Sequence, residues 1–182
     1  MIEPWKLLES EYIIDNKWIR FSSRKFQLPN GVTITDYYVV EKPDIIVVVP
    51  LTYDRQTLVM REFERGVMEV GFKFPAGRVK KDEDPIDAAQ REFKEETGIS
   101  IDKIIAVGTL DADPGWLTTK VHVFVAEIST QDAQASSDPQ ELFEIEWRSF
   151  KSFGEMISRG DVHNIFVVAA YHLAEKYLET SE

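Results

Sequence analysis

The residues of this chain that could do chemistry are concentrated between Gly77 and Ile99. The segment follows the pattern G-x5-E-x7-R-E-φ-x-E-E-x-G-φ, where φ is a bulky apolar residue, and its acids are Glu83, Glu92, Glu95 and Glu96. Carboxylate oxygens are the ligands that Mg²⁺ and similar hard cations prefer. A carboxylate can also act as a general base. The spacing therefore indicates metal-assisted chemistry.

A helix must hold these acids in place. Asp84 can cap the helix, Pro85 suits its first position, and Gly98 suits the left-handed residue that ends it. The spacing predicts a helix over residues 85–97. The three glutamates of its last turns share one side. A second stripe, made of Ile86, Ala89 and Phe93, is expected to pack on a core.

Acids gathered at the surface of a helix C-terminus repel one another and oppose the helix dipole, and Arg91 and Lys94 offset this cost only in part. A bound cation would reverse the sign of the cost. A short E-x-x-E-E string alone is more typical of a solvated acidic helix. With Gly77, Glu83 and Gly98 at their spacing, the catalytic interpretation is favoured.

The full pattern resembles the Nudix box, with Phe93 where that family more often has an aliphatic residue. The resemblance implies an α/β fold, the Nudix α/β/α sandwich with a mixed β-sheet. It also implies hydrolysis of a nucleoside diphosphate linked to another moiety. Mg²⁺ is the expected metal, and Mn²⁺ is a possible substitute.

Flanking segments narrow the resemblance. Residues 61–65 (Arg-Glu-Phe-Glu-Arg), 74–77 (Phe-Pro-Ala-Gly) and 114–116 (Pro-Gly-Trp) are similar to those of ADP-ribose pyrophosphatases and nucleotide-sugar relatives. In that subfamily an N-terminal β-domain exchanges across a homodimer and helps to build the partner's substrate site. The resemblance thus implies a small N-terminal antiparallel β-domain at 1–41, a Nudix domain at 42–182, and a homodimer.

The resemblance also implies roles for individual residues. The metal ligands would be Ala76 (through its carbonyl), Glu92, Glu95, Glu96 and Glu141. Arg91 would orient the glutamates, and Glu141 or Glu95 would be the general base, with Glu144 competing for the position of the loop glutamate. The substrate would be bound by Trp18 (stacking on the base), Arg61, Arg65, Pro114, Gly115 and Trp116.

Alternatives remain open. Trp18 could be a core or interface residue, Arg65 an ordinary surface ion pair, and Pro114-Gly115 a plain turn. Asp36 stands where ADP-ribose enzymes often have a second stacking aromatic, so broad acceptance of ADP-, UDP- or GDP-linked sugars is expected. The chain could instead be a specific GDP-mannose or UDP-sugar pyrophosphatase or a non-catalytic nucleotide-sugar sensor. A triphosphate cleaner is disfavoured by the long N-terminal meander.

Composition sets outer limits. The formal net charge is −11 and cysteine is absent, so non-specific nucleic-acid binding and thiolate metal sites are not expected. The acidic start and the lack of a long apolar run predict a cytoplasmic protein without a signal peptide or membrane span. His122, His163 and His172 lack ligand spacing and are expected to be structural.

Periodicity predicts the remaining elements. Strands are expected near residues 5–14, 18–26, 32–40, 45–51, 57–63, 67–70, 103–110, 119–128 and 142–148, and helices at 150–158 and 162–178. Residues 129–140 are expected to form a polar loop. In the last helix the buried stripe is expected to contain Ile165, Val168, Ala169, His172, Leu173 and Tyr177.

Overall fold

The computed structural model describes residues 2–134 and 142–181. The chain divides into two compact units, one formed by Met1–Pro43 with Asp111–Lys120, the other by Asp44–Leu110 with Val121–Glu182. The elements are β1 (Lys6–Asp15), β2 (Arg20–Gln27), β3 (Thr33–Glu41), β4 (Ile45–Thr52), β5 (Gln56–Glu64), β6 (Glu69–Lys73), β7 (Ala76–Arg78), α1 (Pro85–Thr97), β8 (Lys103–Asp111), β9 (Lys120–Ile128), β10 (Phe143–Ser149), α2 (Phe150–Arg159) and α3 (Ile165–Ser181).

The first unit is an antiparallel sheet in the order β1-β2-β3. Trp5, Phe26 and Tyr37 form an edge-to-face aromatic cluster on it, with centroids 5.4–6.3 Å apart. The segment 111–120 joins this unit because Val40 N–H donates to the Trp116 carbonyl at 2.8 Å. Strand β1 is exposed along its whole length. A three-stranded sheet of this kind leaves much apolar surface uncovered.

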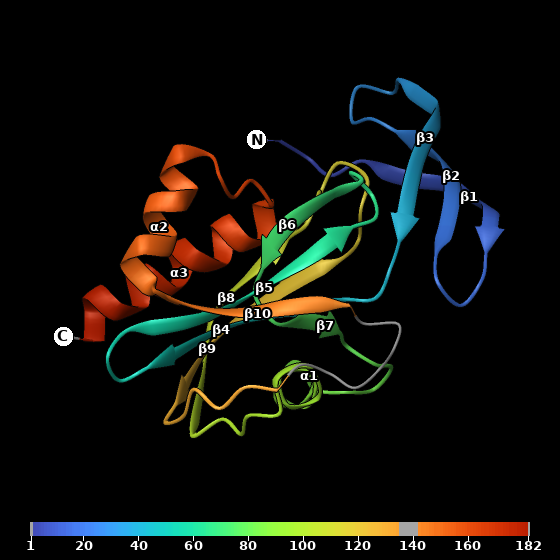
Figure 1. Cartoon of the computed structure of the whole chain (residues 1–182). Helices are drawn as coiled ribbons and strands as arrows, with labels where there is room; N and C mark the ends of the chain where they lie inside the picture. Colours follow the sequence, from blue (N-terminus) through green and yellow to red (C-terminus); the bar gives the residue numbers. More distant parts are fainter. Residues whose placement is uncertain (1, 135–141, 182) are drawn as a thin grey trace. The chain divides into compact units, whose positions relative to one another are not determined.

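The second unit is built on a mixed seven-stranded sheet. Its main path is β10-β5-β4-β9-β8, while β6 pairs with β5 and β7 pairs with β4. Strands β4 and β9 are parallel, whereas β5 and β7 run antiparallel to β4. Helix α1 covers one face of this sheet and helices α2 and α3 cover the other (Figure 1). The predicted α/β architecture with a separate antiparallel sheet is therefore confirmed.

The burial of β4 and β5 agrees with their central position in the sheet. From Ile46 to Thr52 every residue of β4 is buried, as expected for a strand covered on both faces. On the α1 face, Phe93 and Ala89 pack against Met60 and Leu58 of β5, and all four are fully buried. The side of α1 that carries Phe93 is thus fixed on the sheet, and its glutamates are fixed with it.

Most predicted elements are present, and three details were wrong. Helix α3 begins at Ile165, and its buried side is formed by Val167, Ala170, Tyr171 and Ala174 rather than by the predicted stripe. Ile86 is exposed at the first turn of α1, and Ala88 takes its place in the core. Strand β7 was not predicted. No helix within the described residues is long and apolar enough to cross a membrane.

Candidate functional site

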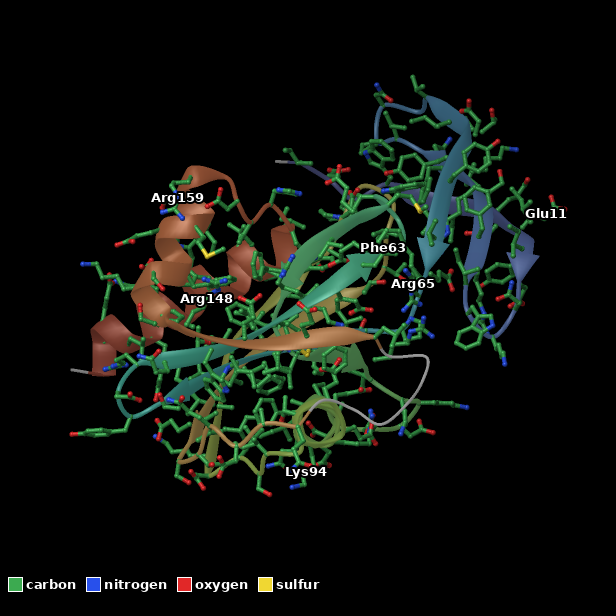
Figure 2. All side chains as sticks on the ribbon, viewed as in Figure 1. Glu11, Phe63, Arg65, Lys94, Arg148 and Arg159 are labelled. Atoms are coloured by element: carbon green, nitrogen blue, oxygen red, sulfur yellow. The ribbon has the colours of Figure 1, made fainter. Side chains whose placement is uncertain are left out.

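Helix α1 has the boundaries that its sequence predicted. The Asp84 carboxylate accepts from the Ile86 N–H at 3.0 Å, and Pro85 occupies the first turn. Gly98 ends the helix in the left-handed region at φ 72°, and its N–H donates to the Lys94 carbonyl at 3.0 Å. Lys94 is exposed on this helix (Figure 2). These caps fix the rotation of the helix and so the direction of its glutamates.

The short strand β7 brings its backbone against two of those glutamates. One Glu96 oxygen accepts from the Ala76 N–H at 3.0 Å. A Cβ atom added to Gly77 would lie 2.0 Å from the Glu92 carboxyl carbon, so only glycine leaves room for the Glu92 side chain in this conformation. Because Ala76 and Gly77 pair with Val47 and Ile46 of β4, the central sheet holds this contact in place.

The acids of the site form two groups, and the first consists of Glu83, Glu92 and Glu95 around the side chain of Arg91. The guanidinium contacts Glu83 at 2.8 Å, Glu92 at 2.7 Å and Glu95 at 3.2 Å. The hydrogen bond from Arg91, followed by the Lys80 N–H, lowers the pKa of Glu83 to about 2. The bond to Glu83 in turn raises the pKa of Arg91 above its usual range. Arg91 thus links the box glutamate Glu83 to the helix glutamates.

Lys73 holds a second carboxylate group. Its ammonium contacts the Glu62 carboxylate directly and lies 3.7 Å from a Glu96 oxygen. Only 8% of the Glu96 side chain is exposed, so the expectation that this acid lies on the surface was wrong. Burial lowers the pKa of Lys73, but Glu96 and Glu62 outweigh that effect and the pKa lies above its usual range. The ammonium is therefore charged at neutral pH.

The donor set suits a hard divalent cation. Glu92 and Glu96 lie against the backbone of Gly77 and Ala76, and Arg91 connects Glu92 to Glu83 and Glu95. Within the described residues, no three acidic or histidine side chains yet converge at metal-binding distance. Arg91 and Lys73 divide the acids into two groups instead. Oxygen-rich chemistry and the glycine cradle at Gly77 both fit Mg²⁺ or Mn²⁺.

The candidate general bases have different positions. Glu141, the first choice from sequence, lies outside the described residues. Glu95 is 57% exposed and pairs with Arg91. Glu144 pairs in register with Arg61, whereas its neighbour Ile145 packs in the core beneath α1. The Glu144 side chain is therefore on the sheet face that points away from the α1 glutamates.

Two arginines were predicted to bind substrate, Arg61 on β5 and Arg65 just after it, and among the described residues neither forms an ion pair with a glutamate of α1. Arg61 contacts Glu144 at 3.5 Å and lies over the Phe72 ring, on the face covered by α2. Arg65 is 77% exposed and contacts Glu62 at 3.4 Å. Figure 2 shows Arg65, with Phe63, at the end of β5. The structure thus brings Arg65 to the edge of the second carboxylate group and places Arg61 elsewhere.

The remaining predicted substrate residues belong to the N-terminal unit. Trp18 is 56% exposed, and the Lys17 ammonium lies 4.6 Å from its ring centroid. It lines a hollow of about 380 Å³ together with Asn16, Lys17, Ile19, Arg20, Glu41, Lys42, Pro43 and Thr118. Pro114, Gly115 and Trp116 form an exposed turn that Asp113 caps through the Gly115 N–H at 3.2 Å.

Sequence reasoning missed Lys73 and Glu62. A signal for Glu62 was present, because alternation along β5 puts residue 62 on the same face as the core residues Leu58 and Met60. That face meets α1. Lys73 gave no such signal, since its two partners come from segments distant in sequence.

Comparisons with known families and proteins match both units. The NUDIX domain profile matches residues 42–165, and the profile of the nucleoside diphosphate sugar hydrolase N-terminal domain matches residues 5–40. An ADP-ribose pyrophosphatase of Bacillus subtilis (strain 168) is 26% identical over 178 residues, covering 97% of this chain and 94% of that protein.

Two further proteins show the same likeness. The methanol dehydrogenase activator of Bacillus methanolicus is 25% identical over 77% of this chain and 76% of its own length. A crystal structure of an ADP compounds hydrolase superposes with a TM-score of 0.84 at 21% identity, covering 100% of this chain and 97% of that one. At this identity the superposition supports the fold.

Proposed function

Because the chain belongs to the Nudix family and is a Nudix hydrolase, we propose that it hydrolyses the diphosphate bond of ADP-ribose or of nucleoside diphosphate sugars. The products would be a nucleoside monophosphate and a sugar phosphate. The observation that carries the proposal is the placement of Glu92 and Glu96 against the backbone of Ala76 and Gly77. An N-terminal region that matches nucleoside diphosphate sugar hydrolases supports the substrate class.

The residues that would hold Mg²⁺ are Ala76, Glu92, Glu95, Glu96 and Glu141, and Mn²⁺ could replace Mg²⁺. Such an ion, when bound, neutralises charge on the diphosphate and lowers the pKa of a bound water. Arg91 contacts Glu92 and Glu95 and so orients both carboxylates. Gly77 lets Glu92 approach the strand backbone closely.

A carboxylate must take the proton of the attacking water. Glu141 is our first candidate because it lies two residues before β10 in the sequence, and Glu95 is the second. Glu144 is the weaker choice, since its side chain is 77% exposed on the other face of the sheet and pairs with Arg61. We expect Glu141→Gln to lower kcat with little change in KM, and Glu144→Gln to leave both unchanged.

Trp18 and the turn at Pro114, Gly115 and Trp116 are proposed to recognise the nucleoside, with Arg61 and Arg65 as further contacts. An exposed indole beside Lys17 can stack on any base, because every base presents a π-face. We therefore expect several bases to be accepted. The alternative within the same chemistry is an enzyme specific for GDP-mannose or UDP-sugars. A sensor that binds nucleotide sugars without turnover is the alternative outside catalysis.

A substrate panel in Mg²⁺ tests the proposal. ADP-ribose, ADP-, UDP- and GDP-sugars and nucleoside triphosphates would be offered, and the monophosphate product would be measured after coupling to a phosphatase. Turnover of diphosphate-linked sugars is expected. Glu96→Gln should lower kcat by orders of magnitude while circular dichroism and the melting temperature show a folded protein. Binding without turnover would favour the sensor, and near-normal turnover by Glu96→Gln would refute the site.

A homodimer is part of the same proposal. Strand β1 and the residue before it expose six large apolar side chains, each with between 39% and 55% of its surface accessible: Trp5, Leu7, Leu8, Tyr12, Ile13 and Ile14. Apolar side chains in such a row are typical of a protein interface. We propose that the N-terminal sheet packs on a second copy of the chain, as the subfamily resemblance implies.

A further inference from the structure

The ammonium of Lys73, on strand β6, approaches the buried carboxylate of Glu96 at the C-terminal end of α1. Lys73 pairs in register with Met60 on β5, so its side chain lies on the face that α1 covers. Its ammonium contacts Glu62, lies 3.7 Å from Glu96, and is 5.8 Å from the centre of the Phe143 ring. Only 21% of the side chain is exposed.

Glu62 restrains that ammonium. It lies two residues after Met60 on β5, on the same face of the sheet, and opposite Phe143 of β10. It also contacts Arg65, but that arginine is mostly solvent-exposed, so Lys73 is the more buried partner. The Glu96 carboxylate is shared in a similar way, because its other oxygen accepts from the Ala76 N–H. Glu62, Lys73 and Glu96 therefore form a row from β5 to α1 in which Glu62 and Lys73 are partly buried and Glu96 is buried.

We propose that Lys73 is a positioning residue that sets the affinity of the α1 carboxylates for a divalent cation, and that Glu62 holds its ammonium away from them. The inference rests on the proposed role of Glu96 as a metal ligand. An ammonium near Glu96 competes with a second cation for the same oxygens, whereas an ammonium held by Glu62 forms a nearly neutral pair. Affinity for the metal then depends on how Lys73 is shared between two acids.

Replacing Lys73 and replacing Glu62 should change the affinity for a metal ion in opposite directions, because the two side chains carry opposite charges. Lys73→Met removes a positive charge and leaves Glu62 with only the mostly exposed Arg65 as its cationic partner, which makes the local field more attractive to a cation. Glu62→Gln leaves Lys73 with Glu96 as its remaining buried carboxylate, which makes the field less attractive. A charge within about 4–6 Å commonly changes a binding equilibrium by one order of magnitude or more. If Lys73 and Glu62 only stabilised the fold, replacing either residue would weaken metal binding.

The experiment measures Mn²⁺ binding to the metal-free full-length protein, by the electron paramagnetic resonance signal of free Mn²⁺, without substrate. We expect Lys73→Met to lower Kd about tenfold and Glu62→Gln to raise it about tenfold. The double variant should return to within about threefold of the wild type, because it removes both charges. Lys73→Arg keeps the charge and should also stay within about threefold. Melting temperatures without metal confirm that each variant is folded.

Lys103→Met is the matched control. It removes one positive charge from the same unit, but Lys103 is an exposed residue that pairs with Glu127 at 2.9 Å, so Kd should not change. Weaker binding in both Lys73→Met and Glu62→Gln, or no change in either, would overturn the proposal. The metal assignment fails separately if Glu96→Gln binds Mn²⁺ as tightly as the wild type. A wild type that binds no Mn²⁺ would overturn both.

Discussion

At the scale of single residues, the site depends on how opposite charges are paired. The helix glutamates would repel one another at the C-terminal end of α1, where the helix dipole also opposes them. Arg91 contacts three acids and Lys73 contacts two, so each acid of this cluster is close to a cation. The negative charge of this cluster is therefore balanced in large part by Arg91 and Lys73, and binding a cation requires these pairs to be shared or exchanged.

The Glu83–Arg91 pair makes stability depend on pH. The pKa of Glu83 is about 2 in the folded protein and about 4.5 when the chain is unfolded. A depressed carboxyl pKa contributes stability that is fully present above pH 4.5 and is lost as the pH falls through 2. Urea midpoints measured between pH 6 and pH 3 should therefore fall less steeply in Glu83→Gln than in the wild type. Asp102→Asn, which removes an exposed carboxylate, should follow the wild type. Parallel curves for Glu83→Gln and the wild type would contradict the pairing.

Gly77 is predicted to serve the site more than the fold. An alanine Cβ there would lie 2.0 Å from the Glu92 carboxyl carbon, and the flexible end of that side chain can move away. We expect Gly77→Ala to lower kcat by at least tenfold while stability changes by about 0.5 kcal/mol or less. Gly66→Ala is the control, because nothing lies within 4 Å of its added Cβ. An active Gly77→Ala enzyme would show that the position of Glu92 is not critical.

At the scale of elements, the sequence predicted those features that depend on residues close together in the chain. The helix 85–97 was correct at both ends, because Asp84, Pro85 and Gly98 act within one turn of the helix. The buried side of α3 was wrong, because its residues are apolar on more than one side and contacts with α2 and the sheet decide its rotation. Strand β7 was missed because a strand of three residues is too short to show an alternating pattern in the sequence. It is defined by its pairing with β4.

The same limit applies to the candidate site. The Nudix pattern identifies the glutamates of α1, since they are close together in sequence. The contact of Lys73 with Glu62 and Glu96 joins β6, β5 and α1, so it depends on strand register and helix rotation together. Arg61 shows the same limit, because its segment resembles a substrate motif, whereas strand alternation sets the direction of its side chain and places it at the Phe72 ring, on the face covered by α2.

The contact between α2 and α3 gives a prediction for the element scale. A Cβ added to Gly154 on α2 would lie 2.1 Å from the Tyr171 hydroxyl and 2.5 Å from its ring. Tyr171 is buried and stacks on Phe150 at 4.4 Å, so it has little room to move. We expect Gly154→Ala to destabilise the protein by about 1–3 kcal/mol, the usual cost of overpacking. Urea unfolding measures this cost, with Gly66→Ala as the control. Specific activity of the folded fraction should not change.

At the scale of the whole molecule, charge is unevenly distributed. Residues 1–43 contain six Lys or Arg and six Asp or Glu, although the complete chain has a net charge of −11. The excess of acids therefore belongs to residues 44–182. A neutral sheet with an exposed apolar strand can approach a second copy of the chain without the repulsion that two acidic surfaces would meet.

The dimer is the prediction that follows at this scale. Ile13 is 55% exposed near the C-terminal end of the apolar row on β1, and a charge there would have to be desolvated in an interface. We expect light scattering after gel filtration to give a dimer for the wild type at micromolar concentration and a monomer for Ile13→Glu. Glu11→Gln on the same exposed strand should remain dimeric, because it adds no charge.

If the partner's N-terminal sheet helps to form each substrate site, Ile13→Glu should also raise KM while the Mn²⁺ affinity of the α1 carboxylates is unchanged. A monomeric wild type with full activity would refute the dimer and its role together, and would leave the metal site of α1 untouched.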